Sequence, residues 1–128
     1  MFSRHVRTRL GGWPLGLVLA VAGLAGLSGP AAAHHGWSAY DAGTVLTLTG
    51  TIVEAGYEHP HAFVRLEVPG RTWLVVLAPP SRMERRGVTR AMLAPGTRAV
   101  VVGYPHRDDP QEMRAERITL DGRTTELR

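Results

Sequence analysis

The amino-terminal quarter of the chain carries an export pattern, and this pattern limits how much sequence is left to fold. Arg4, Arg7 and Arg9 precede an uncharged run over residues 10–29, after which Pro30 leads into three alanines. A positive head, an apolar middle and small residues before the cut are typical of a secretory signal peptide. We therefore predict a signal peptide over residues 1–33, cleavage before His34, and a single domain over residues 34–128.

A retained membrane anchor is the alternative for this segment, because the uncharged run approaches the length that spans a bilayer. The glycines and alanines within the run and the alanines at its end favour cleavage instead. A lipid anchor would need a cysteine at the cut, and the chain has no cysteine. Arg7-Thr8-Arg9 is not a twin-arginine pair, so we expect export by the general secretory pathway to the periplasm or the extracellular space. No stable membrane span is expected after cleavage.

Charge and composition exclude several classes of protein. All 15 basic residues are arginine against 11 acids, but three of the arginines belong to the predicted signal, which leaves 12 and a net charge of about +1. Export and near-neutrality both argue against a nucleic-acid partner. The lack of cysteine excludes a disulfide scaffold, a thiol nucleophile, a zinc ribbon and an iron–sulfur site.

Short apolar segments bounded by Gly, Pro or Asp recur along residues 34–128 and predict strands. The segment 45–54 alternates, and Gly50 within it indicates a bulge or a sharp bend. The segment 61–68 alternates with Ala62, Val64, Leu66 and Val68 on one face. The continuous apolar run 73–77 predicts a strand buried on both faces.

The remaining segments predict a short helix, a further strand and a closing hairpin. Ser81 and Glu84 fit a capping box for a helix that Gly87 can end, and residues 89–93 suggest another helical turn. A strand is expected over 98–104 and an exposed loop over 103–111. Residues 113–120 and 123–127 are expected to close the chain as a hairpin, with a type I′ turn at Asp121-Gly122.

This order of elements predicts a mainly β fold. Five strands with one short helix between the third and fourth match a small OB-like barrel, and a five-stranded sandwich is the alternative.

The histidines carry the most specific chemical signal. His34-His35 would begin the mature chain, and His59-Pro60-His61 opens the second predicted strand. Cleavage before His34 frees an α-amine with a pKa near ~8, which can bind a metal together with the imidazole of the same residue. A third nitrogen from another histidine would complete the arrangement called a histidine brace.

A sulfur-free, nitrogen-rich site favours Cu(II), with Ni(II) or Zn(II) next. We take His34 and His61 as the main candidate ligands, with His35 and His59 as alternates. Cleavage one residue earlier would place a histidine at position three, an arrangement that also binds Cu(II). The simpler interpretation is a solvated histidine tail and a strand-edge histidine that only hydrogen-bonds a neighbour, such as Asp41, Glu54 or Glu58.

Several stretches resemble a family of small exported bacterial proteins catalogued as a domain of unknown function. These stretches are His34-His35-Gly36-Trp37-Ser38-Ala39-Tyr40-Asp41, Leu48 to Glu54, His59-Pro60-His61, Trp73 to Pro80, Arg86-Gly87, Leu93 to Gly96 and Val102 to Pro105. Members similarly begin the mature chain with His-His and carry an Asn-Pro-His strand motif, at which this chain has His59 in place of Asn. The resemblance implies export and a compact β-rich domain, and it brings no established reaction.

Other chemistry has less support. Only Ser38 and Ser81 remain after the signal, without the motif of a serine hydrolase, and no glycine-rich phosphate loop follows a strand. The acids are scattered and Asp108-Asp109 lies in a predicted loop, which does not favour a calcium or glycosidase site. The arginines over 82–90 are most simply a solvated face.

We therefore expect an exported binding protein rather than an enzyme, with Cu(II) or Zn(II) at the histidines. The alternative is a metal-free envelope domain that binds a protein or a small ligand on a face formed by Trp37, Phe63 and Trp73. A histidine-brace copper enzyme ranks last, because 95 residues leave little room for a substrate groove beside a core.

Overall fold

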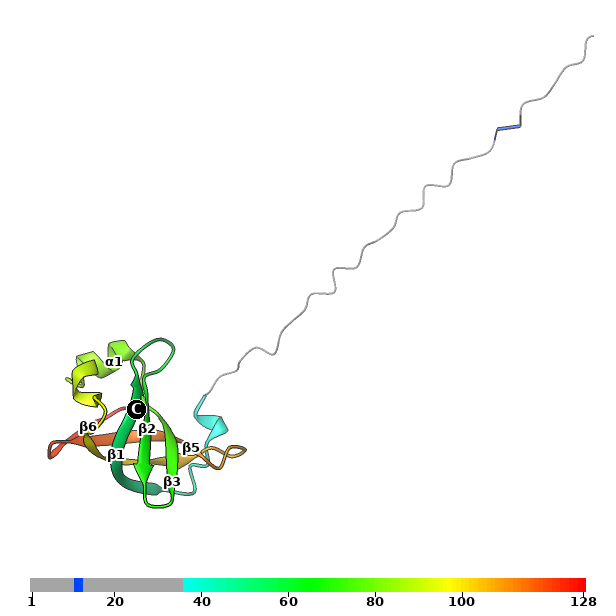
Figure 1. Cartoon of the computed structure of the whole chain (residues 1–128). Helices are drawn as coiled ribbons and strands as arrows, with labels where there is room; N and C mark the ends of the chain where they lie inside the picture. The colour runs from blue at the N-terminus through cyan, green and yellow to red at the C-terminus, as the bar shows by residue number, and fades with distance from the viewer. Residues whose placement is uncertain (1–10, 13–35) are drawn as a thin grey trace, which may run out of the picture. The chain divides into compact units, whose positions relative to one another are not determined.

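The computed structural model describes residues 11–12 and 36–128, and residues 36–128 form a small β-barrel (Figure 1). A 3-10 turn, η1, precedes the first strand. The elements in chain order are η1 (Trp37–Ala39), β1 (Leu46–Gly56), β2 (Phe63–Val68), β3 (Arg71–Val76), α1 (Pro80–Arg85), the 3-10 turn η2 (Arg90–Leu93), β4 (Arg98–Pro105), β5 (Glu112–Leu120) and β6 (Arg123–Glu126).

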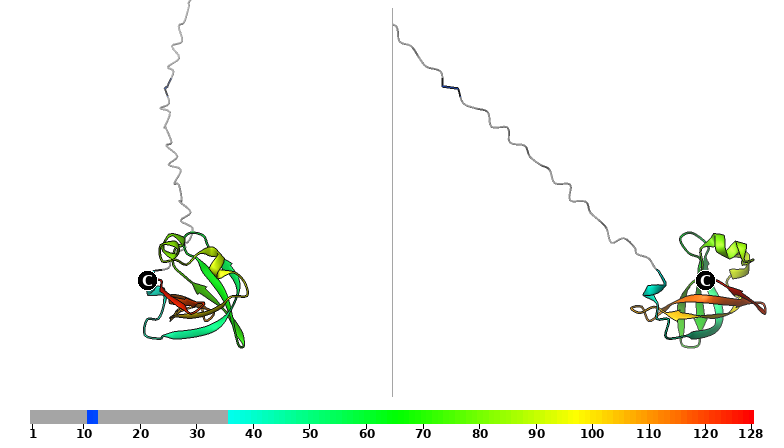
Figure 2. Two further views of the ribbon diagram at one scale, coloured as in Figure 1. Left: turned by 90° about the vertical axis from the view of Figure 1, so that its left-hand side faces the viewer. Right: turned by 180° about the vertical axis from the view of Figure 1, so that it is seen from behind.

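Strand order confirms the predicted OB-like barrel. β1 pairs with both β2 and β4, β2 with β3, and β4 with β5, all antiparallel. A short parallel pairing of β3 with β5 then closes the five strands into a barrel. β6 lies outside this ring and pairs with β5 alone. The views in Figure 2 show α1 and η2 together at one end of the barrel, between β3 and β4 in the chain.

Alternating side chains fill the barrel interior, as the pattern of the second strand predicts. Ala62, Val64 and Leu66 are fully buried, whereas Arg65 and Glu67 are exposed. The main core cluster contains Ile52, Tyr57, Ala62, Val64, Leu66, Trp73, Val75, Leu77, Met83, Val88, Leu93, Ala99, Val101, Met113, Ala115, Ile118, Leu120 and Leu127.

The expectation that the third strand is buried on both faces is wrong. Trp73, Val75 and Leu77 are buried, but Leu74 and Val76 are only half-buried, so β3 is not covered on both faces. Closing the sheet into a barrel buries only the inner face of each strand. The outward pair is left to line a groove, described below.

The bulge of the first strand lies at a different residue from the one that its sequence suggests. The register between β1 and β2 shifts between Ile52 and Glu54, not at Gly50. Gly50 serves a close strand contact: a Cβ there would lie 2.2 Å from the carbonyl oxygen of Glu67. Figure 1 shows the strong curvature that lets β1 pair with β2 at one end and with β4 at the other.

The predicted capping box is wrong, and proline explains why. α1 begins at Pro80, with Pro79 as N-cap, so Ser81 lies inside the first turn where its side chain cannot cap. Proline is favoured at the first helical position because it has no N–H to leave unpaired. The predicted end is confirmed, since Gly87 follows the helix with a φ of 79°.

The last hairpin confirms its turn chemistry. Asp121 and Gly122 have φ values of 48° and 74°, the left-handed pair that a type I′ turn requires. Among the described residues, no helix is long and apolar enough to cross a membrane.

Candidate functional site

An apolar groove of about 360 Å³ lies on the outer face of β2 and β3. The cross-strand pairs Phe63–Val76 and Arg65–Leu74 form its floor and one side. The full set of lining residues is Tyr40, Pro60, His61, Phe63, Arg65, Leu74, Val76 and Glu112. The groove therefore combines the two strands with the β1–β2 loop, the start of β5 and the segment before β1.

A glycine on the neighbouring strand fixes the aromatic side of the groove. Gly56 pairs with Phe63, and a Cβ at position 56 would lie 2.1 Å from Cε1 of the Phe63 ring. The ring thus lies directly over the backbone of β1, in the space that any larger residue would occupy. An aromatic ring that covers a glycine on the adjacent strand is a known way to stabilise a sheet, and here it also gives the groove a fixed wall.

Tyr40 and Glu112 form the polar end of the groove. The Tyr40 hydroxyl donates a 2.5 Å hydrogen bond to Oε1 of Glu112, and only 2% of Tyr40 is exposed. Burial, this hydrogen bond and the charge of Glu112 all raise the pKa of Tyr40, so the phenol stays neutral and remains a donor. The ring also packs edge-on against His106, with centroids 5.2 Å apart.

His61 contacts a buried arginine. Nη2 of Arg114 lies 3.2 Å from Nε2 of His61, and Arg114 is 6% exposed. Because a guanidinium carries only donors, Nε2 of His61 is the acceptor. Burial lowers the pKa of Arg114, although a guanidinium remains charged across the accessible pH range.

The same arginine holds the segment that precedes β1. Its guanidinium lies 4.5 Å from the centroid of the Trp37 ring, and Arg128 lies 4.7 Å from it. Tyr104 meets the indole edge-on at 6.1 Å. Stacking of this kind contributes ~0.5 to 2 kcal/mol per cation, so Trp37 anchors η1 on the barrel.

Only some of the predicted site residues lie at the groove. His61 and Phe63 line the groove, and Arg114 links Trp37 to His61. Trp73 is 8% exposed and points inward, with the Arg71 guanidinium 4.0 Å from its ring centroid, so it does not share a face with Phe63.

The remaining histidines are not brought into this groove. His59 is exposed in a bend of the β1–β2 loop, and β2 begins only at Phe63, so the His-Pro-His sequence precedes the strand instead of opening it. His34 and His35 lie outside the described residues. Within residues 11–12 and 36–128, no group of three or more His, Asp or Glu side chains is arranged to hold a metal ion.

Sequence patterns did not single out Leu74, Val76 and Glu112 of the groove lining, or Arg114 beside His61. Leu74 and Val76 are hidden within an apolar run that looks uniformly buried. Glu112 and Arg114 are 72 and 53 residues from the side chains they contact, Tyr40 and His61. A local motif cannot indicate contacts at such separations.

The arginines of the 82–90 region have a structural role. Arg82, Arg86 and Arg90 donate to the backbone carbonyls of Leu127, Glu126 and Tyr57. These bonds hold α1 and η2 against the barrel, which a solvated face alone would not do.

Comparison with known families gives one match. A family model described as a family of unknown function (DUF6152) covers residues 21–114. The chain belongs to the DUF6152 family. In this DUF6152 protein the match includes every residue that lines the apolar groove, from Tyr40 through Glu112, and extends to Arg114. No curated protein matches the chain.

Proposed function

We propose that this DUF6152 protein is an exported ligand-binding module whose binding site is the groove on β2 and β3. The observation that carries the proposal is the location of the groove. In OB-folds the face of the second and third strands, flanked by the loops after strands one and four, is the usual binding surface. The groove has this position, with Pro60 and His61 in the first loop and Glu112 just after the other. This part of the argument is an analogy between folds.

The chemistry of the lining defines the class of ligand. Phe63, Leu74 and Val76 offer an apolar surface, and Oε1 of Glu112 is already held by Tyr40. A small, flat, mostly apolar molecule with one hydrogen-bond donor directed at Glu112 fits this arrangement. A volume of about 360 Å³ lies within the range of small-molecule sites.

Anilinonaphthalene sulfonate, an anionic dye that fluoresces on apolar surfaces, tests the groove directly. Leu74→Glu places a charge on the groove floor and is expected to weaken probe binding by about tenfold or more. Val45→Glu is the matched control, because Val45 is 64% exposed and does not line the groove. Equal probe binding by the two variants would contradict the proposal.

Export is the second part of the proposal and is supported by the pattern of residues 1–33. Expression in a bacterium followed by fractionation and intact-mass measurement tests it. The expected product is a periplasmic or secreted chain that begins at His34. A product that retains residues 1–33 would overturn it.

Copper or zinc binding at the histidines is a second candidate, favoured by one observation. Trp37, three residues after His34, is joined to His61 through Arg114. A chain spans at most ~3.6 Å per residue, so His34 lies within ~11 Å of Trp37 along the backbone. A link of this length permits a metal site shared by His34 and His61.

The charge of Arg114 restricts how such a site would work. Its guanidinium contacts Nε2 of His61, so a second cation at that nitrogen would be repelled. His61 would bind a metal through Nδ1, with His35 or His59 as alternate ligands.

Calorimetry with Cu(II) and with Zn(II) on the cleaved protein tests the metal site. His34→Ala is expected to abolish tight metal binding and to leave probe binding in the groove unchanged. His61→Ala is expected to weaken metal binding. Affinity weaker than micromolar in the unmodified cleaved protein would contradict a metal role. Oxidation of a reductant with oxygen or peroxide would be required to support the copper-enzyme alternative.

A further inference from the structure

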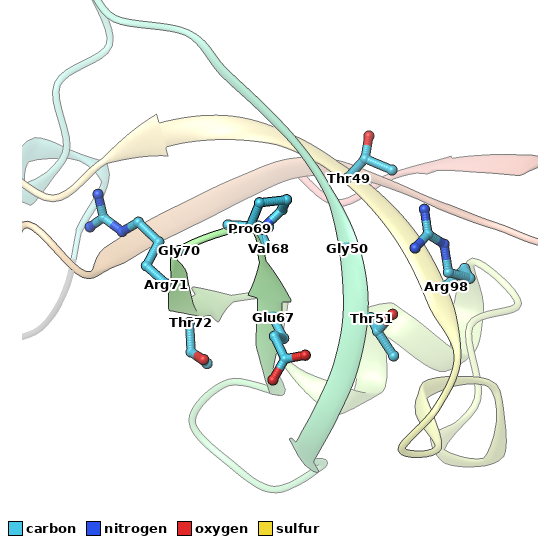
Figure 3. A pocket seen from close by; sticks show the side chains of 10 residues that line it. All are labelled: Thr49, Gly50, Thr51, Glu67, Val68, Pro69, Gly70, Arg71, Thr72 and Arg98. Atoms are coloured by element: carbon cyan, nitrogen blue, oxygen red, sulfur yellow. The ribbon is translucent and has the colours of Figure 1, made fainter.

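A second groove, polar and about 750 Å³ in volume, lies at the other end of the same two strands (Figure 3). It surrounds the turn between β2 and β3 and extends over β1 to the start of β4. Its functional groups are the hydroxyls of Thr49, Thr51 and Thr72, the carboxylate of Glu67, and the guanidinium groups of Arg71 and Arg98.

Strand register places four of these side chains in one row. Thr72 pairs with Glu67, Glu67 with Thr51, and Thr51 with Arg98. The row therefore crosses four neighbouring strands at right angles to them. With ~4.8 Å between strands, it extends for ~14 Å.

A glycine keeps this row close together. A Cβ at Gly50 would lie 2.2 Å from the carbonyl oxygen of Glu67, so only glycine lets β1 approach β2 this closely. The approach brings Thr51, the next residue, beside Glu67. The arrangement of the row thus depends on a specific backbone feature.

The polar groups of the row are available to a ligand. Within residues 11–12 and 36–128, the side chains of Thr51, Glu67, Thr72 and Arg98 make no hydrogen bond or ion pair. Arg71 lies at the opposite end of the groove from Arg98. Its guanidinium stacks on Trp73 and donates to the carbonyl of Pro110. In Figure 3 the two arginines flank the groove, with Glu67 and Thr51 between them.

We propose that this row binds an acidic saccharide of the uronic acid class, independently of the apolar groove. Guanidinium groups pair with carboxylates through charge-assisted hydrogen bonds, which places the acid of the ligand at Arg98. Threonine hydroxyls both donate and accept, and the Glu67 carboxylate only accepts, so the middle of the row matches the hydroxyls of a sugar ring. A second acid further along the saccharide would meet Arg71.

Glu67 argues against a ligand that is merely anionic. A carboxylate placed over Glu67 would be repelled, whereas sugar hydroxyls would donate to it. A polyanion without hydroxyls therefore matches only the two ends of the row. An acidic saccharide matches all of it.

Binding of oligogalacturonate, measured by calorimetry on the cleaved protein, tests the proposal. Polyglutamate supplies the charge without the hydroxyls, and a neutral maltooligosaccharide supplies the hydroxyls without the charge. We expect binding of oligogalacturonate alone, weakened by about tenfold in Arg98→Gln and by about fivefold in Thr51→Val. Arg85→Gln is the matched control, because Arg85 is exposed on α1 and does not line the groove.

Each other outcome would overturn the proposal. Equal binding of polyglutamate would show that the groove recognises negative charge alone. Binding of the neutral saccharide would show that recognition does not need a carboxylate at Arg98. An equal loss in Arg85→Gln would show non-specific attraction. Because neither Arg98 nor Thr51 lines the apolar groove, unchanged probe binding there shows that the variants are folded and that the two sites fail or succeed separately.

Discussion

Nη2 of Arg114 lies 3.2 Å from Nε2 of His61. The same guanidinium stacks on Trp37, so one buried cation connects the edge of the apolar groove with the segment that enters the barrel. The position of this segment matters for binding, because it carries Tyr40, which forms the polar end of the groove.

Arg114→Lys tests whether shape or charge anchors the segment. Lysine keeps the charge and its cost of burial but loses the planar surface that stacks on Trp37. We expect the free energy of unfolding in urea to fall by about 1 to 2 kcal/mol. The signal of the Trp37 indole N–H in NMR spectra should also shift.

Arg117→Lys is the control for this change. Arg117 forms an exposed ion pair with Glu126, and such pairs contribute ~0 to 1 kcal/mol. An Arg114→Lys variant no less stable than this control would show that stacking contributes nothing.

Gly56→Ala is expected to destroy the shape of the apolar groove. The new methyl would lie 2.1 Å from the Phe63 ring, which must move, at a cost of about 1 to 3 kcal/mol. Probe binding in the groove should weaken with it. Gly36→Ala is the matched control, since its Cβ would meet only Ser38 Oγ at an ordinary 3.6 Å.

A double variant sharpens the same prediction. If the clash with Phe63 is the cause, Gly56→Ala should cost much less stability when Phe63 is already Ala. Additive losses in this cycle would assign the effect of Gly56 to another neighbour.

The three tyrosines should ionise late in an alkaline titration. Burial raises the pKa of Tyr40 and Tyr57 above 10.0, and the hydrogen bond to Glu116 raises that of Tyr104. The unfolded chain loses these protons near pH 10.0 and the folded chain does not, so stability is full below this pH and falls as pH rises above it. Ultraviolet absorbance of phenolate measures this. A transition centred at 10.0 for all three would be inconsistent with the structure.

Tyr57→Phe should cost about 1 to 2 kcal/mol, because it leaves a buried carbonyl without its donor. The Tyr57 hydroxyl donates to the carbonyl of Val88 at 2.5 Å and thereby ties the end of β1 to the helical segment. Thermal unfolding measures the change. Tyr104→Phe, which loses a bond to the more exposed Glu116, should have the smaller effect.

Local patterns were sufficient to predict the barrel. The alternation of Ala62, Val64 and Leu66 and the turn chemistry of Asp121-Gly122 both report on single strands and single turns, so they can be interpreted without the rest of the chain. Two of the errors have local causes of their own. Pro80 begins the helix one residue before the predicted capping serine, and an apolar run cannot distinguish the inside of a closed barrel from a groove on its outside.

The candidate sites were predicted only in part, because they depend on pairing between distant segments. His61 and Phe63 were identified from their own neighbourhood. Tyr40 with Glu112, and Arg114 with His61, meet only after the barrel has formed. The row from Thr72 to Arg98 likewise exists only in the register of four paired strands.

The parallel pairing of β3 with β5 has a consequence for folding kinetics. Together with the pairing of β1 with β4, it joins the two local meanders, β1–β3 and β4–β6, here through residues 74–76 and 112–114. Contacts so distant in sequence carry a loop-closure cost before they stabilise anything, so we expect the two meanders to form early and their joining to limit the rate. Arg98 of the polar groove and Glu112 of the apolar groove come from the second meander. The other strand residues that line the two grooves come from the first. The ability to bind should therefore appear in the last kinetic phase of folding, as the two halves meet.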